Sequence, residues 1–364
     1  MMTVPYSHLA YPQRQTETEA ILTDIRKVVE AGDFTLGRAV GELEEAWAAY
    51  CGTQHAVAVA NGTDALALSL MAYGIGRGDT VMTTPYTFVA TVGAILQAGA
   101  RPAFADIGAD GLINLPSDRQ YLDSSVTGLM PVCWAGAPWI VPPLFHRRPD
   151  TLRAIVLDAC QAIGATPSPG AIVGATAYSL HPLKNLHVWG DGGMITTDLD
   201  WLADRLRLLR NHGLSDRDTW AQAGYNSRLD TIQAVVALHG LRTLDGVLAQ
   251  RRANAARYDR NLAGCSGVTI PRRHPGHTYH LYQVLVRDRT GLLVHLAAAG
   301  IEAKVHYPVP LHLQPALAYL GYKRGHFPHA EHWADTAITL PVHQYLSDSD
   351  IDYVSDQVRS FYGI

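Results

Sequence analysis

The stretch "HAVAVANGTDALALSLMAYG", residues 55–74, contains the unit on which the predicted fold rests. Its first six residues form an apolar run of strand length, Asn61 and Gly62 supply a tight turn, and the rest carries apolar residues at helical spacing. A buried strand followed at once by a helix is the repeating unit of α/β proteins with a parallel sheet. The stretch therefore predicts the first strand and helix of such a sheet.

The same alternation continues through the first two thirds of the chain. Short apolar runs bounded by Gly, Pro or Asp recur at residues 79–85, 101–107, 128–134 and 153–159, and a helical pattern covers 88–99. This order of elements predicts an α/β fold with a mostly parallel, doubly wound sheet.

The last third has a different organisation. Residues 230–264 show one long helical pattern, which we expect to run from the first lobe towards a second one. The strand-like and helical runs between 280 and 362 are typical of a small α/β lobe. We therefore expect a large cofactor-binding domain over residues 1–245 and a smaller C-terminal α/β domain over 246–364. The proline-rich stretch around Pro142, Pro143 and Pro149 is expected to be a loop.

Composition excludes several classes of protein. The chain has 364 residues, of which 48% are hydrophobic and 17% charged, with a net charge of -4. These values argue against a disordered chain and against a basic nucleic-acid binder. The sequence shows neither a secretory signal pattern nor an apolar run of membrane-spanning length, so we expect a cytoplasmic protein without a membrane partner. Four scattered cysteines argue against a disulfide framework and a zinc ribbon.

Two further motifs do not indicate a binding site. The glycines of "GIGRGD", residues 74–79, follow a helix and precede a strand, which is the wrong order for a dinucleotide fingerprint. The string "HFPHAEH", residues 326–332, spaces three histidines by threes but contains a proline and lacks the usual partner ligands. We expect no metal site.

Thr63 follows the Asn61-Gly62 turn, at or near the start of a helix. Free backbone N–H groups and the helix dipole at such a position bind anions, and a hydroxyl adds another donor. The pattern indicates a phosphate site at Gly62 and Thr63, although an ordinary helix N-cap turn has the same appearance.

A buried strand in "RAIVLDACQAIGA" ends at Asp158, and Gln161 follows on the next turn. In a doubly wound sheet the carboxyl ends of the strands form the ligand crevice. A carboxylate there is suited to a pyridinium nitrogen, because it keeps that nitrogen protonated and makes the ring an electron sink. The alternative is that Asp158 caps a helix.

Lys184 stands alone among small, apolar and ring-bearing residues in "AYSLHPLKNLHVWGDGGMITT", residues 177–197. Burying an ammonium without a partner is expensive, so an isolated lysine in this setting indicates a function. An aldehyde cofactor needs an amine that holds it and then moves protons at the substrate carbon. Ser179 can bind a phosphate, and the glycines of "GDGG" let the backbone pass closely. The alternative is an incidental lysine in a strand, loop and hairpin.

Phe88 lies at a strand-to-helix turn in "TTPYTFVATVGAIL". An aromatic ring there can stack on a flat heterocycle, although a phenylalanine at such a position is more often part of the core.

These motifs together resemble a known family. Over nearly its whole length the chain resembles the sugar aminotransferases of the DegT/DnrJ/EryC1/StrS group, which have the type I fold of pyridoxal-phosphate enzymes. Six strings in the same order carry the resemblance: "GDFTLGRAVGELEEAWAAYCGTQHAVAVANGTDAL", "TPYTFVATVGAI", "LDACQAIGA", "HPLKNLHVWGDGGMITT", "GYNSRLDTIQA" and "GIEAKVHYPVPLH". The resemblance implies pyridoxal 5'-phosphate as cofactor.

The resemblance also implies a role for each matching residue. Lys184 would hold the cofactor as a Schiff base and act as acid and base, and Asp158 would pair with the pyridine nitrogen. Gln161 would approach the ring hydroxyl, and Phe88 would stack on the ring. The cofactor phosphate would be held by Gly62, Thr63 and Ser179.

Other residues are implied to act on the substrate or across subunits. Asn226 of "GYNSRLD" would reach the phosphate of the neighbouring subunit, which implies a homodimer with shared active sites. Arg228 would help to shape that shared pocket. In "GIEAKVHYPVPLH", His306 and Tyr307 are expected to bind the substrate.

The implied reaction is transfer of an amino group from glutamate or glutamine to a keto sugar, in amino-sugar or secondary-metabolite biosynthesis. Asp191 in "GDGG" resembles the branch that acts on nucleotide-linked keto-hexoses, whereas many relatives carry Glu there. The usual "PVHLYG" string is instead "PVCWAGAPW", residues 131–139, near the expected substrate entrance. A keto cyclitol therefore stays an alternative substrate.

Two further alternatives share the fold. Dehydratases of the family carry histidine in place of the lysine, so Lys184 argues against that chemistry. A regulatory ligand-binding module would not need every catalytic motif.

A substrate linked to a nucleoside diphosphate would require fixed positive charge at the rim of the pocket. Four basic residues are candidates for this rim, although they can equally be exposed surface charges. These candidates are Arg272, Arg273, Lys323 and Arg324.

Overall fold

The computed structural model describes residues 3–7, 9, 15–115, 125–140, 151–168 and 174–363. Seven strands form its central sheet, in the order β1-β7-β6-β5-β4-β2-β3. They are β1 (His55–Val59), β2 (Thr80–Thr83), β3 (Arg101–Phe104), β4 (Val126–Leu129), β5 (Ala154–Asp158), β6 (Ala175–Ser179) and β7 (Gly193–Thr197). β7 runs antiparallel to both neighbours and all other pairs are parallel, so the prediction of a mostly parallel sheet is confirmed.

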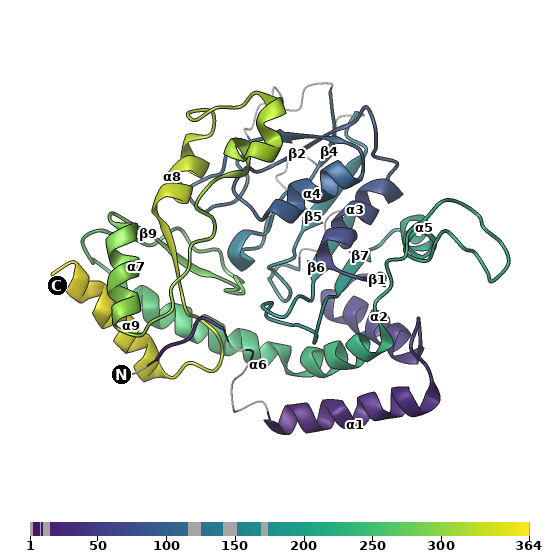
Figure 1. Cartoon of the computed structure of the whole chain (residues 1–364), viewed down its shortest axis with the longest axis horizontal. Coiled ribbons are helices and arrows are strands. Elements are labelled where there is room, and N and C mark those ends of the chain that lie inside the picture. The colour runs from purple at the N-terminus through teal and green to yellow at the C-terminus, as the bar shows by residue number, and fades with distance from the viewer. Residues whose placement is uncertain are drawn as a thin grey trace.

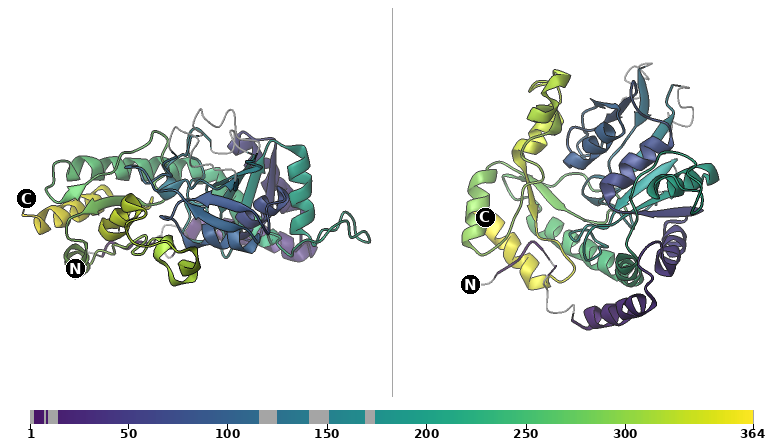
Figure 2. Two further views of the ribbon diagram at one scale, coloured as in Figure 1. Left: turned by 90° about the horizontal axis from the view of Figure 1, so that it is seen from above. Right: turned by 45° about the vertical axis from the view of Figure 1, so that its right-hand side comes forward.

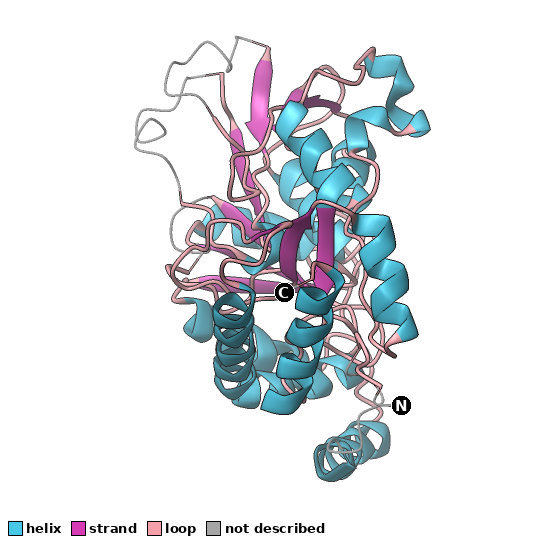
Figure 3. Cartoon of the chain, turned by 90° about the vertical axis from the view of Figure 1, so that its left-hand side faces the viewer, coloured by secondary structure: helices cyan, strands magenta, loops and turns pink. Residues whose placement is uncertain are grey.

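Helices cover both faces of this sheet, as the strands' apolar composition requires (Figure 3). On one face lie α3 (Gly62–Ala72), α4 (Val89–Gln97) and α5 (Asp200–Arg210), packed on one cluster of buried side chains. On the other face lie α2 (Arg38–Cys51) and part of α6 (Thr231–Leu262), packed on a second cluster. α3 is almost entirely buried, which explains why its sequence is apolar on all sides.

The long helix α6 extends from the large sheet to the smaller C-terminal part of the chain, as its sequence predicts (Figure 1). It contacts α1 (Gln15–Ala31) and α2 at one end and α9 (Asp348–Phe361) at the other. The predicted domain boundary between residues 245 and 246 falls inside this continuous helix, and the division stays a prediction.

The C-terminal part contains a three-stranded antiparallel sheet in the order β10-β9-β8. The strands are β8 (Val268–Thr269), β9 (Tyr282–Val286) and β10 (Ala337–Leu340), and helices α7 (Arg289–Ala298), α8 (Pro328–Thr336) and α9 lie beside them. Near the N-terminus, Val4 forms an isolated bridge with Ile301, which follows α7, and is fully buried in the core of this part. Val4 is thereby fixed on the C-terminal part of the chain.

An extended hairpin follows α5 and projects from the body of the molecule, at the right-hand end in Figure 2, left. Isolated bridges join Asn211 to Asn226 and Leu214 to Trp220. The Trp220 side chain is 72% exposed although it is large and apolar. No helix among the described residues is long and apolar enough to cross a membrane. The loop predicted around Pro142, Pro143 and Pro149 lies outside the described residues.

Candidate active site

A cavity of about 590 Å³ opens where the carboxyl ends of β5 and β6 meet the N-terminus of α3. This is the edge at which doubly wound sheets bind ligands, and the volume is in the usual range for small-molecule sites. Most of the predicted site residues line the cavity: Gly62, Thr63, Phe88, Asp158, Gln161, Ser179, Lys184, His306 and Tyr307.

The N-terminus of α3 forms one wall of the cavity. The Asn61 side chain caps the helix by accepting a hydrogen bond from the Asp64 N–H over 2.8 Å. At Gly62 a Cβ atom would lie 2.7 Å from the Ser179 Cβ, so only glycine lets the serine approach this closely. The Ser179 Oγ accepts from the His181 N–H over 3.3 Å, which leaves its own hydroxyl proton to donate. These groups form a cradle for an anion at a helix N-terminus.

Asp158 ends β5 and is 5% exposed. One carboxylate oxygen, Oδ2, accepts from the Thr91 hydroxyl over 2.7 Å, and Oδ1 accepts from the Cys160 N–H over 3.1 Å. Thr91 in turn lies 2.9 Å from the Thr87 hydroxyl. The carboxylate is therefore fixed in orientation, as a partner for a ring nitrogen needs to be.

Lys184 lies in the turn between β6 and β7, where its N–H donates to the His181 carbonyl over 2.8 Å. The side chain is half-buried and faces the cavity that Asp158 also lines. Burial lowers the pKa of Lys184 below its usual range, and the neighbouring Cys160 and Asp158 partly offset this effect. A larger fraction of the amine is therefore neutral and nucleophilic at a given pH than in water.

Gln161 joins the cavity to the unusual segment 131–139. Its Oε1 accepts from the Ala135 N–H over 2.7 Å, so its amide N–H₂ is the group that can donate towards a ligand. Ala135 has a φ of 58°, a conformation that non-glycine residues seldom adopt. The Trp134 indole donates to the Gln283 Oε1 over 2.7 Å, and Gln283 donates to the His306 carbonyl over 2.8 Å.

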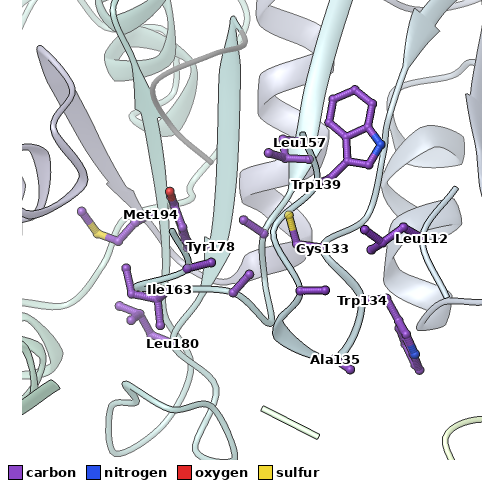
Figure 4. Packing of buried hydrophobic residues seen from close by; sticks show 14 of the residues in the cluster. Leu112, Cys133, Trp134, Ala135, Trp139, Leu157, Ile163, Tyr178, Leu180 and Met194 are labelled. Atoms are coloured by element: carbon purple, nitrogen blue, oxygen red, sulfur yellow. The ribbon is translucent and has the colours of Figure 1, made fainter. Parts of the chain in front are cut away.

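The segment 131–139 is thus part of the core, although the sequence suggests a position near the substrate entrance. Figure 4 shows Cys133, Trp134, Ala135 and Trp139 packed with buried side chains of the sheet, and all four are at most 6% exposed. In this segment Val132 lines the cavity. The segment therefore supports the site through the Asp158 backbone, which pairs with Pro131 and Cys133, through Gln161, and through the Trp134 ring beside Tyr307.

Three neighbouring rings, those of Phe88, His306 and Tyr307, also line the cavity. Phe88 precedes α4 and is 49% exposed, and its ring centroid lies 5.7 Å from that of Tyr307. His306 donates or accepts a hydrogen bond with the Thr339 hydroxyl over 2.9 Å. Burial and the nearby Lys184 lower the pKa of His306 to about 4, so its imidazole is neutral at pH 7. Burial and the Asp158 charge raise the pKa of Tyr307 to about 12.

Asn226 and Arg228 are not among the residues that line this cavity. Asn226 is exposed at the base of the projecting hairpin, and Arg228 donates to the Asn211 Oδ1 over 3.0 Å. Ser227, between them, is buried and donates to the Asp64 Oδ2 over 2.7 Å. The segment is thus anchored beside the α3 N-terminus of its own chain while Asn226 faces outwards.

The four basic residues expected at a substrate rim also do not line the cavity. Arg273 donates to the Gln283 carbonyl and its guanidinium carbon lies 4.7 Å from the ring centroid of Tyr282. Arg324 forms an exposed ion pair with Asp335 at 2.9 Å. Both arginines thus have their partners within the C-terminal part of the chain.

Several residues that line the cavity were not identified from the sequence. Thr91 lies inside an apolar helical run, Tyr6 comes from the N-terminal segment, and Arg251 belongs to the highly charged string "QRRANAARYDR". His343 follows β10, far from the other motifs. A buried polar residue in an apolar helix is a usable signal for Thr91, but the others meet only through the tertiary fold.

The groups in the cavity fit a phosphate-bearing aldehyde with a basic ring nitrogen. The α3 cradle suits the phosphate, buried Asp158 suits a protonated ring nitrogen, and Lys184 supplies the amine. The half-exposed Phe88 ring suits a flat heterocycle. Among the described residues, no group of three His, Cys, Asp or Glu side chains is arranged to hold a metal ion.

Comparison with known proteins agrees with this geometry. A profile of the DegT/DnrJ/EryC1/StrS aminotransferase family matches residues 15–359. The chain is 37% identical to a pleiotropic regulatory protein of Geobacillus stearothermophilus, over 99% of both chains. It is also 37% identical to a dTDP-3-amino-3,4,6-trideoxy-alpha-D-glucose transaminase of Streptomyces venezuelae, covering 98% of this chain and 96% of that protein.

A solved structure of a relative also matches the fold of this chain. The crystal structure of S. venezuelae DesV in complex with a ketimine intermediate superposes with a TM-score of 0.94 at 35% identity, over 100% of both chains. The predicted type I aminotransferase fold is therefore confirmed. Aminotransferases of this family use pyridoxal 5'-phosphate. The chain is a pyridoxal-phosphate-dependent aminotransferase that belongs to the DegT/DnrJ/EryC1/StrS family.

Proposed function

We propose that this enzyme transfers an amino group from glutamate or glutamine to a nucleotide-linked keto-hexose. The observation that carries the proposal is the convergence of Lys184, Asp158 and the α3 N-terminus on one cavity. The substrate class is supported by the Streptomyces venezuelae relative, which is named for a dTDP-linked amino sugar.

In this proposal Gly62, Thr63 and Ser179 hold the cofactor phosphate, because backbone N–H groups and a hydroxyl converge there. Phe88 would cover the cofactor ring, and the Gln161 amide would be the group that donates to the ring hydroxyl. When bound, pyridoxal 5'-phosphate supplies an electron sink for negative charge that develops at the substrate carbon.

Two side chains act directly in the reaction. Asp158 keeps the ring nitrogen protonated, and its orientation is fixed by Thr91 and the Cys160 N–H. Lys184 first holds the aldehyde and then moves a proton at the substrate carbon. Its pKa, lowered by burial, favours the neutral amine that accepts this proton.

The keto sugar is proposed to contact His306 and Tyr307, which line the same cavity as Lys184. The His306 imidazole is neutral, and its backbone carbonyl is held by the Tyr86 hydroxyl and the Gln283 amide. The sugar would therefore meet fixed hydrogen-bonding groups. This geometry suits a polyol and does not by itself distinguish a hexose from a cyclitol, so the keto cyclitol stays the second candidate.

We also propose a homodimer with shared active sites. Asn226 is exposed on a segment that is anchored beside the α3 cradle, and the neighbouring hairpin presents an exposed Trp220. A two-fold axis next to this segment would place Asn226 beside the phosphate of the other subunit and Arg228 at the edge of the shared pocket.

The decisive experiment supplies the purified holoenzyme with glutamate or glutamine labelled with ¹⁵N at the α-amino group and a panel of keto sugars. The panel contains dTDP- and UDP-linked keto-hexoses, a keto cyclitol and free keto-hexoses. We expect ¹⁵N in a nucleotide-linked amino sugar, and inhibition by dTDP or UDP that weakens at high salt. Turnover of the cyclitol with indifference to nucleoside diphosphates would select the second candidate.

A further inference from the structure

Arg251 is a buried cation in the wall of the active-site cavity. It lies on α6, lines the cavity and is only 3% exposed. Its Nη1 donates to the Tyr279 carbonyl over 3.0 Å, while its buried Nε has no hydrogen-bond partner among the described residues. A buried polar group in a native protein is normally satisfied, so an unpaired guanidinium N–H at a cavity calls for a ligand.

No described carboxylate forms an ion pair with Arg251. The carboxylates that line the cavity are Asp64, Asp158 and Asp191, and the first two accept hydrogen bonds from Ser227 and Thr91. Burial lowers the pKa of Arg251 to about 10, which still leaves it charged at neutral pH. A buried charge without a partner is costly unless an anion occupies the site.

Neighbouring Arg252 shows what a satisfied structural arginine looks like in this fold, whereas Arg273 also has a buried Nε without a partner among the described residues but lies over the Tyr282 ring, away from the cavity. Arg252 donates through Nε to the His277 carbonyl over 3.0 Å and through Nη2 to the Gly164 carbonyl over 3.2 Å. Neither Arg252 nor Arg273 lines the cavity, whereas Arg251 does. A structural role therefore explains Arg252 fully but accounts for only part of the donor capacity of Arg251.

The surroundings of Arg251 suit a small carboxylate. Tyr6, His280 and His343 line the same cavity, and they come from the N-terminal segment, the chain before β9 and the chain after β10. The charge of Arg251 acts on the pKa of both Tyr6 and His343, so these two side chains lie near the guanidinium. A guanidinium can hold a carboxylate through two parallel N–H groups, an arrangement that lysine cannot reproduce.

We propose that Arg251 binds the carboxylate of the amino-acid donor during the first half of the reaction. This inference rests on the proposed function, in which glutamate or glutamine brings its amino group to the cavity. The α-carboxylate is attached to the carbon that carries this amino group, so it enters the same enclosed space. Arg251 is then a donor-binding residue that orients the amino acid relative to Lys184.

The test compares the holoenzyme with its Arg251→Gln and Arg251→Lys variants. Arg242→Gln serves as the matched control, because Arg242 is exposed on the same helix. Single-turnover conversion of the bound cofactor is followed by absorbance as glutamate is titrated. We expect the half-maximal glutamate concentration to rise about 30-fold in Arg251→Gln, less in Arg251→Lys, and not at all in the control.

A second measurement does not depend on turnover. Maleate, an unreactive dicarboxylate, should raise the thermal midpoint of the wild-type holoenzyme through binding to the folded state. It should do so much less in either Arg251 variant, and Arg251→Lys carries this test if Arg251→Gln does not fold. Equal stabilisation by maleate together with an unchanged glutamate titration would overturn the assignment.

Two further outcomes distinguish a wrong role for Arg251 from a wrong choice of amino donor. A defect confined to the second half-reaction, and seen with a keto-uronate but not with a neutral keto-hexose, would assign Arg251 to an acidic sugar and overturn the proposal. If the wild-type enzyme reacts with neither glutamate nor glutamine, the proposed donor is wrong. In that case maleate stabilisation that disappears in the Arg251 variants still supports a carboxylate site, and its persistence contradicts one.

Discussion

The Thr91 hydroxyl donates a 2.7 Å hydrogen bond to Oδ2 of Asp158, at the end of the central strand β5. Thr91 belongs to the first turn of α4, so the helix that begins just after Phe88 also sets the orientation of the carboxylate. One helix start therefore positions both Phe88 and the Asp158 carboxylate, which are the proposed partners of the cofactor ring.

We expect Asp158→Asn to lower kcat by about 100-fold or more while the cofactor stays bound, because fixed charge matters most when negative charge flows into the ring. Thr91→Val should lower kcat by about tenfold, since it removes one hydrogen bond to a charged group. For each variant, the steady-state kcat and the amount of bound cofactor are measured.

Near-normal turnover of Asp158→Asn with cofactor bound would mean that Asp158 has a structural role only.

Gly62→Ala tests the phosphate cradle. The added Cβ would lie 2.7 Å from the Ser179 Cβ, so either the helix start or the serine must move. We expect cofactor affinity to fall roughly 10-fold or more, as overpacking commonly costs about 1–3 kcal/mol. Gly93→Ala in α4 is the control, because a Cβ there meets no atom within 4 Å. Equal cofactor affinity of the two variants would argue against a phosphate at Gly62.

Shared active sites can be tested by mixing subunits. Lys184→Ala and Asn226→Asp should each be inactive, and a mixed dimer should contain one site with neither substitution. Partial recovery of activity after subunit exchange is expected, with homodimers of each variant as the baseline. If exchange is verified by mass spectrometry and activity stays at baseline, Asn226 does not serve the partner's site.

The protein should lose stability as the pH falls below about 6.5, the ordinary pKa of histidine. His277 is buried, and its Nδ1 accepts from the Tyr279 N–H over 2.9 Å, so the folded state keeps the ring neutral. Burial, together with nearby Arg273, lowers the pKa of His277 well below the usual value. Below pH 6.5 the unfolded chain binds a proton that the folded chain does not.

The resulting loss is at most about 1.4 kcal/mol per pH unit for each such histidine, and it is absent above pH 6.5. Urea unfolding at pH 7.5, 6.0 and 5.0 measures it. His277→Gln should show a smaller dependence on pH than the wild type over this range. An identical dependence in both proteins would mean that His277 is protonated in the folded state.

Local sequence was sufficient to predict the position of the site residues that directly follow a strand. The apolar run before Asp158 and the turn before Thr63 both mark strand ends, and parallel strands bring such ends to one edge. The same reasoning could not find Arg251 or Tyr6, which are 245 residues apart in sequence and meet only through the packing of the N-terminal segment on the C-terminal part.

The segment 131–139 shows a second limit of local reasoning. Its departure from the family string suggested an altered substrate entrance, whereas its residues are buried and support Asp158, Gln161 and Tyr307 from behind. An apolar segment can lie either in a core or at an apolar pocket mouth, and composition alone does not distinguish the two.

The central claim is that Lys184 carries the cofactor of a transaminase. Reduction of the holoenzyme with borohydride, followed by digestion and mass spectrometry, should find the cofactor attached to the peptide that contains Lys184. Addition of glutamate before borohydride should prevent the labelling, because the amino group has then passed to the cofactor. Attachment to any other lysine, or labelling that glutamate and glutamine leave unchanged, would contradict the account.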